Sequence, residues 1–140
     1  MPMISLQYAA LDNDPMLKTR LARTVSKLSA VHLGKDQNVT AVAVQAVSPD
    51  DWFIADRSLR DHGRSAFWVD IRVVDGTNTR DQKAAFVAAT FDAMAELIGP
   101  LHSESYVHVN EVRGDAYGYG GVTQNERYIA GKLRPQIKVA

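Results

Sequence analysis

Apolar and polar side chains alternate at the start of the chain. From Met3 to Ala10, one side of this stretch carries Ile4, Leu6 and Tyr8, and the other side carries smaller or polar residues such as Ser5. A period of two residues is typical of a strand with one buried face. We therefore predict a half-buried strand that begins directly after Pro2.

An amphipathic helix is predicted next. Asp14 is a suitable N-cap residue, and Pro15 suits the first helical position. Apolar residues then recur every three or four positions, and Gly34 provides a stop. The apolar stripe consists of Leu17, Leu21, Val25, Leu28 and Val31 or His32.

Three further segments complete the first half. Residues 39–47 are small and β-branched, which predicts a second strand, and Trp52 to Ile54 form a short apolar hairpin arm. Residues 56–64 are polar and are interpreted as a linker.

The same order of elements then repeats. Residues 66–74 predict a strand, and Thr79 followed by Gln82 is a capping-box signature for a helix that ends at Gly99. Residues 106–112 predict another strand, and residues 117–121 another hairpin arm. The apolar side of this second helix consists of Phe86, Val87, Thr90, Phe91, Met94, Leu97 and Ile98.

A single shift of 65 positions superposes the two halves. It carries Asp14 onto Thr79, Gly34 onto Gly99 and Trp52 onto Tyr117. A cap, a helix stop and a hairpin arm that coincide under one shift indicate a fused duplication of a β-α-β unit of about 60 residues.

The duplication predicts the fold class. One helix joins the two long strands of each unit, so these strands should be parallel with a right-handed crossover. We predict an α/β protein (α+β by some schemes), with a four-stranded sheet and two helices on one face. A single domain would contain repeat one (about 2–56), a linker (57–65), repeat two (about 66–121) and a C-terminal strand and tail (122–140). The uncovered sheet face implies that subunits associate.

Composition excludes several function classes. Sixteen basic and sixteen acidic side chains cancel, so nothing directs the chain to nucleic acid or anionic membranes. It has no cysteine, no apolar run of membrane-spanning length and no signal-peptide profile. Its four histidines lack ligand spacing, so we expect no metal. We expect a cytoplasmic protein.

Pro2 is the main candidate for chemistry. If Met1 is removed, the strand begins with a secondary amine, and burial or nearby cations would lower its pKa. Such an amine can act as a general base near neutral pH. The structural alternative is that Met-Pro is only a start signal before an edge strand.

Pro2, the tandem unit and the Tyr117-Gly118-Tyr119-Gly120-Gly121 hairpin together resemble the tautomerase superfamily. The likeness is to its fused members, which double a unit similar to 4-oxalocrotonate tautomerase, and it covers roughly residues 2–121. Malonate semialdehyde decarboxylase and cis-3-chloroacrylic acid dehalogenase are such members. Residues 76–83 are similar to the family's strand-to-helix junction. The resemblance implies the trimer-forming tautomerase/MIF-like fold, a homotrimer, and Pro2 in a pocket at a subunit boundary.

The resemblance also places the other site residues. The family's carboxylate-binding arginine at the junction falls on Asn78, and the arginine early in the second strand falls on Ala41 and Tyr106, so both arginines are missing. Trp52 and Tyr117 match the aromatic wall, and His108 stands where the dehalogenase has a tyrosine. We predict that Asn78, Tyr106 and His108 orient or polarise substrate oxygens.

A carboxylate-bearing substrate would then need another cation. Arg64 in the linker is one candidate, although a solvated linker is the plainer explanation for it, and Arg72 is another. We predict a tautomerase or isomerase that needs no cofactor and acts on small enol or unsaturated keto acids. The alternatives are a non-catalytic oligomeric binding or signalling member, and a hydratase or decarboxylase type that uses Pro2 as an acid. In a hydratase, Asp115 would activate water.

Overall fold

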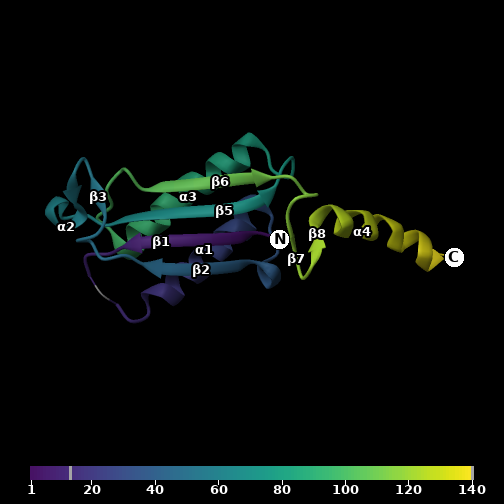
Figure 1. Cartoon of the computed structure of the whole chain (residues 1–140), viewed down its shortest axis with the longest axis horizontal. Coiled ribbons are helices and arrows are strands. Elements are labelled where there is room, and N and C mark those ends of the chain that lie inside the picture. The colour runs from purple at the N-terminus through teal and green to yellow at the C-terminus, as the bar shows by residue number, and fades with distance from the viewer. Residues whose placement is uncertain (13, 140) are drawn as a thin grey trace.

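The computed structural model describes residues 1–12 and 14–139, with side chains in the last helix as far as Leu133. Its centre is a four-stranded sheet of order β2-β1-β5-β6. The strands are β1 (Met3–Ala9), β2 (Ala41–Ala46), β5 (Ala66–Val74) and β6 (Tyr106–Val112). β1 is parallel to β2, β5 is parallel to β6, and β1 is antiparallel to β5 (Figure 1). The predicted fold class is confirmed.

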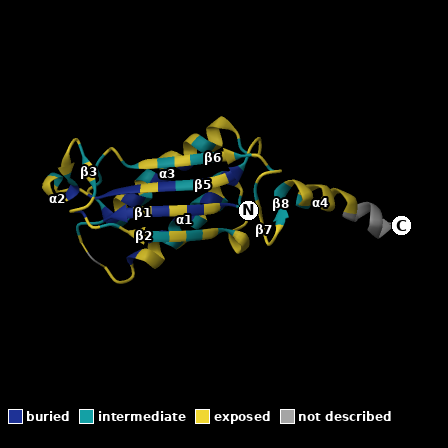
Figure 2. Cartoon of the chain, in the orientation of Figure 1, coloured by how far each residue is buried: buried dark blue, intermediate teal, exposed yellow. Residues whose placement is uncertain are grey.

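The two long helices cover one face of the sheet. α1 (Leu17–Leu33) and α3 (Arg80–Ile98) lie side by side behind the strands in Figure 1. The two central strands direct alternate side chains into this layer and expose the others (Figure 2). Fully buried residues such as Leu6, Leu21, Phe67 and Phe86 form the core.

Helix ends match the sequence prediction at most positions. Thr79 and Gln82 form the predicted capping box at the start of α3, and Gly34 ends α1 in a left-handed conformation. The predicted cap at Asp14 is wrong. The N-cap position of α1 is Met16, which has no side-chain cap, and Asp14 instead accepts a hydrogen bond from the Met16 N–H.

The predicted apolar stripes need a small correction. Val31 is exposed, and Ser29 and Leu33 are buried in its place, because the α1 stripe drifts around the helix at its last turn. Val87 of α3 is also largely exposed.

Each repeat ends in a small antiparallel hairpin. The first pairs β3 (Phe53–Ile54) with β4 (Arg57–Ser58), and the second pairs β7 (Gly118–Tyr119) with β8 (Val122–Thr123). Both turns use two residues of positive φ, Ala55 and Asp56 in the first and Gly120 and Gly121 in the second. The shift of 65 therefore holds for the turn conformation as well.

A helix follows each hairpin, and this differs from the sequence prediction. The supposed linker contains β4 and α2 (Leu59–His62), which is capped by Ser58 and buries Leu59 completely. The supposed C-terminal strand and tail consist of β8 and α4 (Gln124–Val139), and residue 140 lies outside the described residues. Thr123 accepts from the Glu126 N–H as Ser58 does from Asp61, so the two helices start at equivalent positions.

The other sheet face is open in the single chain. Met3, Trp68 and Tyr106 are each more than a third exposed there, and the two long helices lie on the opposite face (Figure 1). Such a surface is typical of a face that another subunit covers. Within the described residues, no helix has the length and apolar character needed to cross a membrane.

Candidate active site

A pocket of about 640 Å³ lies at the end of the sheet where β1 begins. Its walls come from the N-terminus, the loop after α1, the end of β5, the loop after β6 and the first turn of α4. The topology brings these segments together. Each parallel crossover returns to the start of its first strand, and antiparallel pairing puts the end of β5 beside the start of β1. The lining includes Met1, Pro2, Lys35, Thr77, Asp115 and Tyr128.

Pro2 is buried at the edge of this pocket. Its carbonyl oxygen accepts a hydrogen bond from the Ala41 N–H at 3.2 Å, which fixes the start of β1 against β2. The carbonyl oxygen of Met1 accepts a hydrogen bond from the Tyr117 hydroxyl at 2.6 Å. The peptide bond between Met1 and Pro2 is therefore held in place by hydrogen bonds to the carbonyl oxygens of both residues.

The surroundings favour an uncharged terminal amine. Burial lowers the pKa of the Met1 amino group, and the positive charges of Lys35 and Arg127 lower it further. Removal of Met1 would place the free amine on Pro2, one residue deeper in the same surroundings. Burial and positive charge, which both lower the pKa of an amine, are thus present at this end of the sheet.

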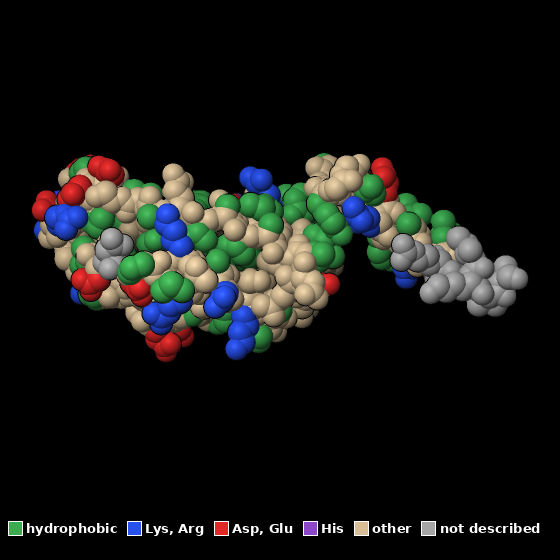
Figure 3. All heavy atoms as spheres, turned by 90° about the horizontal axis from the view of Figure 1, so that it is seen from below, with side chains coloured by type: hydrophobic (Ala, Val, Ile, Leu, Met, Phe, Trp, Pro, Cys, Tyr) green, Lys and Arg blue, Asp and Glu red, His purple; other side chains and the backbone are tan. Residues whose placement is uncertain are grey.

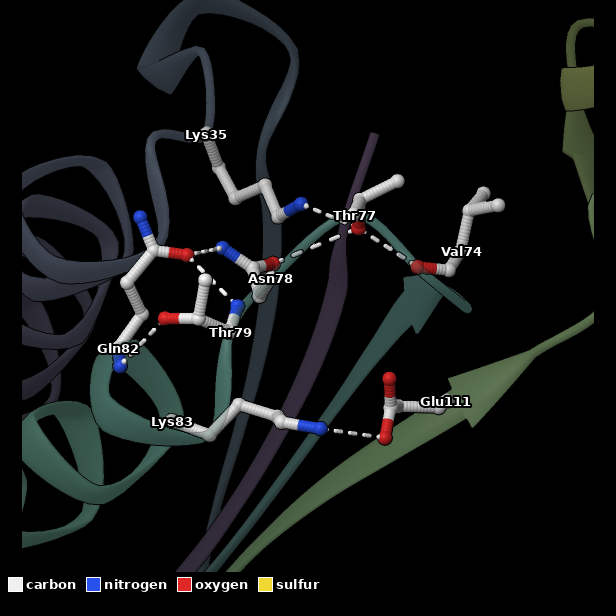
Figure 4. Close-up of polar contacts among 8 residues, drawn as sticks. All are labelled: Lys35, Val74, Thr77, Asn78, Thr79, Gln82, Lys83 and Glu111. Atoms are coloured by element: carbon white, nitrogen blue, oxygen red, sulfur yellow. Dashed lines mark hydrogen bonds and ion pairs between the residues drawn. The ribbon is translucent and has the colours of Figure 1, made fainter.

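Lys35 is the cation that sequence reasoning missed. Its Nζ donates to Thr77 Oγ1 at 3.2 Å, and the Thr77 hydroxyl donates to the Val74 carbonyl oxygen at 2.6 Å (Figure 4). Burial lowers the pKa of the Lys35 ammonium, because a partly desolvated charge is less stable. Lys35 follows the helix stop Gly34, and the crossover rule already places that loop at the Pro2 end of the sheet. That rule was the signal that could have identified it.

Asn78 holds the junction between β5 and α3. Its Nδ2 donates to the Leu33 carbonyl oxygen at 2.8 Å and to Gln82 Oε1 at 3.1 Å. Figure 4 shows this amide between the capping box and Lys35. Both amide hydrogens thus have partners within the chain, although a substrate-orienting role for Asn78 remains a prediction.

The same end of the sheet carries an ion pair between α3 and β6. Lys83 Nζ lies 2.7 Å from Glu111 Oε1, and this contact lowers the pKa of the Glu111 carboxyl group (Figure 4). The pair ties the first turn of α3 to the end of β6. It supports the wall of the pocket without lining it.

Tyr117 stands beside the pocket on the loop before β7. Burial raises the pKa of its hydroxyl, while the Met3 backbone and the charge of Arg72 act in the opposite direction. Arg72 is therefore near this end of the sheet. Its Nε also lies 4.0 Å from Asp70 Oδ1.

Asp115 also lines the pocket, but both of its oxygens are engaged. Arg113 Nε and Nη2 donate to them at 3.0 and 2.8 Å. This bidentate contact lowers the pKa of the Asp115 carboxyl group. A carboxylate held in this way is a weak base for activating water.

Three predicted site residues lie at the opposite end of the same chain. Trp52 and Tyr106 line a groove of about 630 Å³ between the first hairpin and the open sheet face. The Tyr106 ring lies 5.6 Å from the Trp68 ring, and its hydroxyl donates to the Glu104 carboxylate. Arg64 is at this end too, where Nη1 contacts the Leu101 carbonyl oxygen at 3.4 Å.

His108 lies in the middle of the open sheet face. Its Nδ1 is 3.1 Å from Asp70 Oδ2, across neighbouring positions of β6 and β5. Within one chain the structure therefore brings Pro2, Tyr117, Lys35 and Thr77 together. It leaves His108 and the groove residues apart from them.

The position that corresponds to Pro2 in the second repeat is buried. The shift of 65 places Phe67 at the position of Pro2, and Phe67 is fully buried inside β5. Around the equivalent end, Leu59 and Ala66 are fully buried and Trp52 packs on them. At the Pro2 end, by contrast, a chain terminus borders the pocket.

Part of the chain matches the sequence profile of a known family. The sequence profile of the Tautomerase family, described as a tautomerase enzyme, matches residues 68–127, which lie mostly in the second repeat. No curated protein sequence matches the chain.

The fold of the whole chain resembles several solved structures. A fused 4-OT, described as the Q0 wild-type symmetric trimer, has a TM-score of 0.76 at 17% identity, over 89% of this chain and 98% of that one. A macrophage migration inhibitory factor-like protein from Entamoeba histolytica has a TM-score of 0.71 at 16% identity, over 87% and 97%. FG41 malonate semialdehyde decarboxylase inhibited by 3-bromopropiolate has a TM-score of 0.70 at 19% identity, over 94% of this chain and 97% of that one. The predicted resemblance to the tautomerase superfamily is confirmed.

Proposed function

We propose, from the Tautomerase match of residues 68–127 and the fused 4-OT fold of the whole chain, that this protein is a cofactor-independent tautomerase or isomerase of small enol or unsaturated keto acids. The observation that carries the proposal is the position of Pro2. It borders an open pocket in which burial and two cations lower the pKa of the chain's terminal amine.

The reaction is a proton transfer between carbon atoms of a conjugated acid. After removal of Met1, the Pro2 nitrogen takes a proton from the carbon beside the carbonyl group and returns it elsewhere on the conjugated system. A base with a pKa near the working pH is the most effective one for this step. The lowered amine pKa supports this role.

Lys35 is the group we propose for the substrate carboxylate. It lines the pocket with Pro2, whereas Arg64 is at the other end of the sheet. The Thr77 hydroxyl holds the lysine side chain in place, and the partly buried ammonium forms stronger contacts with an anion than an exposed one. Lys35 would thus substitute for the missing arginines at Asn78 and Tyr106.

A homotrimer supplies the remaining predicted residues. The open sheet face needs a covering, and the fused 4-OT protein with the similar fold is described as a trimer. We propose that a neighbouring copy brings Tyr106, His108 and Trp52 to the Pro2 pocket, and that the protein acts in the cytoplasm. Because His108 and Tyr106 lie on the open face, they are accessible to such a neighbour.

A decarboxylase or hydratase is the second candidate. The similarity to malonate semialdehyde decarboxylase and the presence of Asp115 in the pocket favour it. It needs Pro2 to remain protonated, or Asp115 to act as a base. The lowered amine pKa and the Arg113–Asp115 pair argue against both requirements.

Two measurements test the proposal. Mass spectrometry of the purified protein shows whether Met1 is removed, and a retained Met1 would rule out Pro2 as a base. Ketonisation of phenylenolpyruvate, in which Pro2 would take the proton of the enol hydroxyl and deliver it to carbon, is then compared for wild type, Pro2→Ala and His108→Ala. We expect a loss of about 10²- to 10⁴-fold in kcat/KM for Pro2→Ala. Unchanged turnover in that variant would remove the mechanism and favour a non-catalytic binding protein.

A further inference from the structure

The hydroxyl of Tyr117 reaches the place where a substrate oxygen would lie. It donates to the carbonyl oxygen of Met1 at 2.6 Å, and that carbonyl carbon is bonded to the Pro2 nitrogen. Two covalent bonds separate the acceptor oxygen from that nitrogen, so the hydroxyl lies no more than about 5 Å from it.

Removal of Met1 would leave this hydroxyl without its acceptor. Tyr117 is half-buried, and an unpaired donor that is shielded from water is unfavourable. The donor would then face the space beside the new amine, which opens into the pocket. A substrate carbonyl oxygen in that space would replace the oxygen of Met1.

We propose that the Tyr117 hydroxyl is a catalytic hydrogen-bond donor to the carbonyl oxygen of the substrate. This inference rests on the proposed tautomerase function. The sequence predicted Tyr117 only as part of the aromatic wall of the pocket, and the inference adds a role for its hydroxyl group. When the Pro2 nitrogen takes the proton, the C–H bond breaks and its electron pair forms the new C=C bond. The carbonyl π electrons move to oxygen. Later the oxygen electron pair re-forms the C=O bond, the double bonds shift, and a C=C electron pair takes the proton from the prolinium nitrogen at another carbon.

The negative charge that develops on this oxygen needs a donor that remains protonated. Burial raises the pKa of the Tyr117 hydroxyl, so it stays protonated across the neutral range. Removal of one such donor in other enzymes lowers kcat by about 10²- to 10³-fold. The first repeat has Trp52 at the equivalent position, which carries no hydroxyl, so the donor is present only at the Pro2 end.

Tyr117→Phe tests the inference, and Tyr119→Phe is the matched control. Tyr119 lies two residues further along the chain, and its ring packs against the Arg127 guanidinium, whereas the Tyr117 hydroxyl contacts the Met1 carbonyl oxygen. We expect Tyr117→Phe to lower kcat for phenylenolpyruvate by about 10²-fold, with KM and the midpoint of the pH profile nearly unchanged. Tyr119→Phe should keep the wild-type rate.

Several results would overturn the inference. One is a Tyr117→Phe rate within about threefold of wild type, well short of the loss expected for such a donor. A loss explained wholly by KM or by a shifted pH midpoint would assign Tyr117 a positioning role only. If wild type turns over and Pro2→Ala does not, a retained Tyr117→Phe rate contradicts this inference alone; absence of wild-type turnover contradicts both proposals.

A second variant covers the case in which Tyr117→Phe does not fold. Fluorotyrosine at position 117 keeps the shape and lowers the phenol pKa, so the rate should begin to fall at a lower alkaline pH than in wild type. If the rate of this variant falls at the same alkaline pH as that of wild type, the donor role is contradicted.

Discussion

Lys35 and Thr77 join the two loops that flank the start of β1, through a 3.2 Å hydrogen bond between residues 42 positions apart in the chain. One loop follows α1 and the other follows β5. The contact places a partly buried ammonium group at the Pro2 pocket. It is the basis for the first prediction.

Replacement of Lys35 should weaken both substrate binding and the base. In Lys35→Met we expect KM for a carboxylate substrate to rise about 10-fold or more, since a hydrogen bond to a charged group contributes about 1.5–3 kcal/mol. Lys35→Arg keeps the charge and should recover part of the loss. Steady-state kinetics with an acid and its methyl ester provide the check, and equal losses for both would contradict carboxylate binding.

The pH dependence of the rate should report the same charges. The terminal amine has a lowered pKa, so it loses its proton at a lower pH than an ordinary amine. We expect kcat/KM to rise with pH, with a midpoint below the usual α-amino value of about 7.7–8.0. A midpoint at or above that value would show that the amine is not perturbed in this way.

Removal of either cation should move this midpoint upward. A positive charge disfavours the protonated amine, so its loss raises the amine pKa. Lys35 has the larger effect and Arg127 the smaller. We therefore expect a larger upward shift in Lys35→Met than in Arg127→Met, measured from complete pH profiles. The reverse order would indicate that α4 lies closer to the amine than the structure shows.

The two helix starts should respond differently to loss of their polar residue. Thr79 accepts from the Gln82 N–H within a capping box, so Thr79→Ala should lower the free energy of unfolding by about 1 kcal/mol. Asp14 does not cap α1, and Asp14→Ala should have a smaller effect. Urea unfolding measures the loss of stability in each variant. The protein concentration is kept the same, because assembly of subunits makes the apparent stability depend on it. Equal losses would mean that Asp14 has a capping role in solution.

Leu59 should behave as a core residue although it lies in a polar segment. It is fully buried in the small cluster with Ala9 and Ala66. Leu59→Ala should cost about 2–5 kcal/mol of stability, as for other leucines replaced in cores. The neighbouring Arg60 is exposed, and Arg60→Ala should change the unfolding midpoint little. Thermal and urea unfolding of the two variants test this, and a mild effect of Leu59→Ala would support a flexible linker.

Local chemistry explains what the sequence could predict. The alternation from Met3 to Tyr8, the capping box at Thr79 and the stop at Gly34 involve only neighbours along the chain, and the structure agrees with all three. The predicted alternation does not continue beyond Tyr8, because Ala9 is fully buried. The short helix α2 was missed because four residues are too few to show a periodic stripe. In α4, Gly131 and Pro135 weaken the helical signal, so the segment was interpreted as a strand and tail.

By itself, then, the sequence determined the duplicated β-α-β unit, the approximate positions of its long strands, and Pro2 as the residue next to the first one. The second strand was predicted over residues 39–47 and is shorter, because β2 spans Ala41–Ala46. Only the tertiary structure decided which side chains share a pocket with Pro2. Antiparallel pairing of β1 and β5 puts equivalent ends of the two repeats at opposite ends of the sheet. For this reason Lys35 and Tyr117 meet the N-terminus, whereas Arg64 and Trp52, which looked equally suitable as residue types, lie at the far end of the chain.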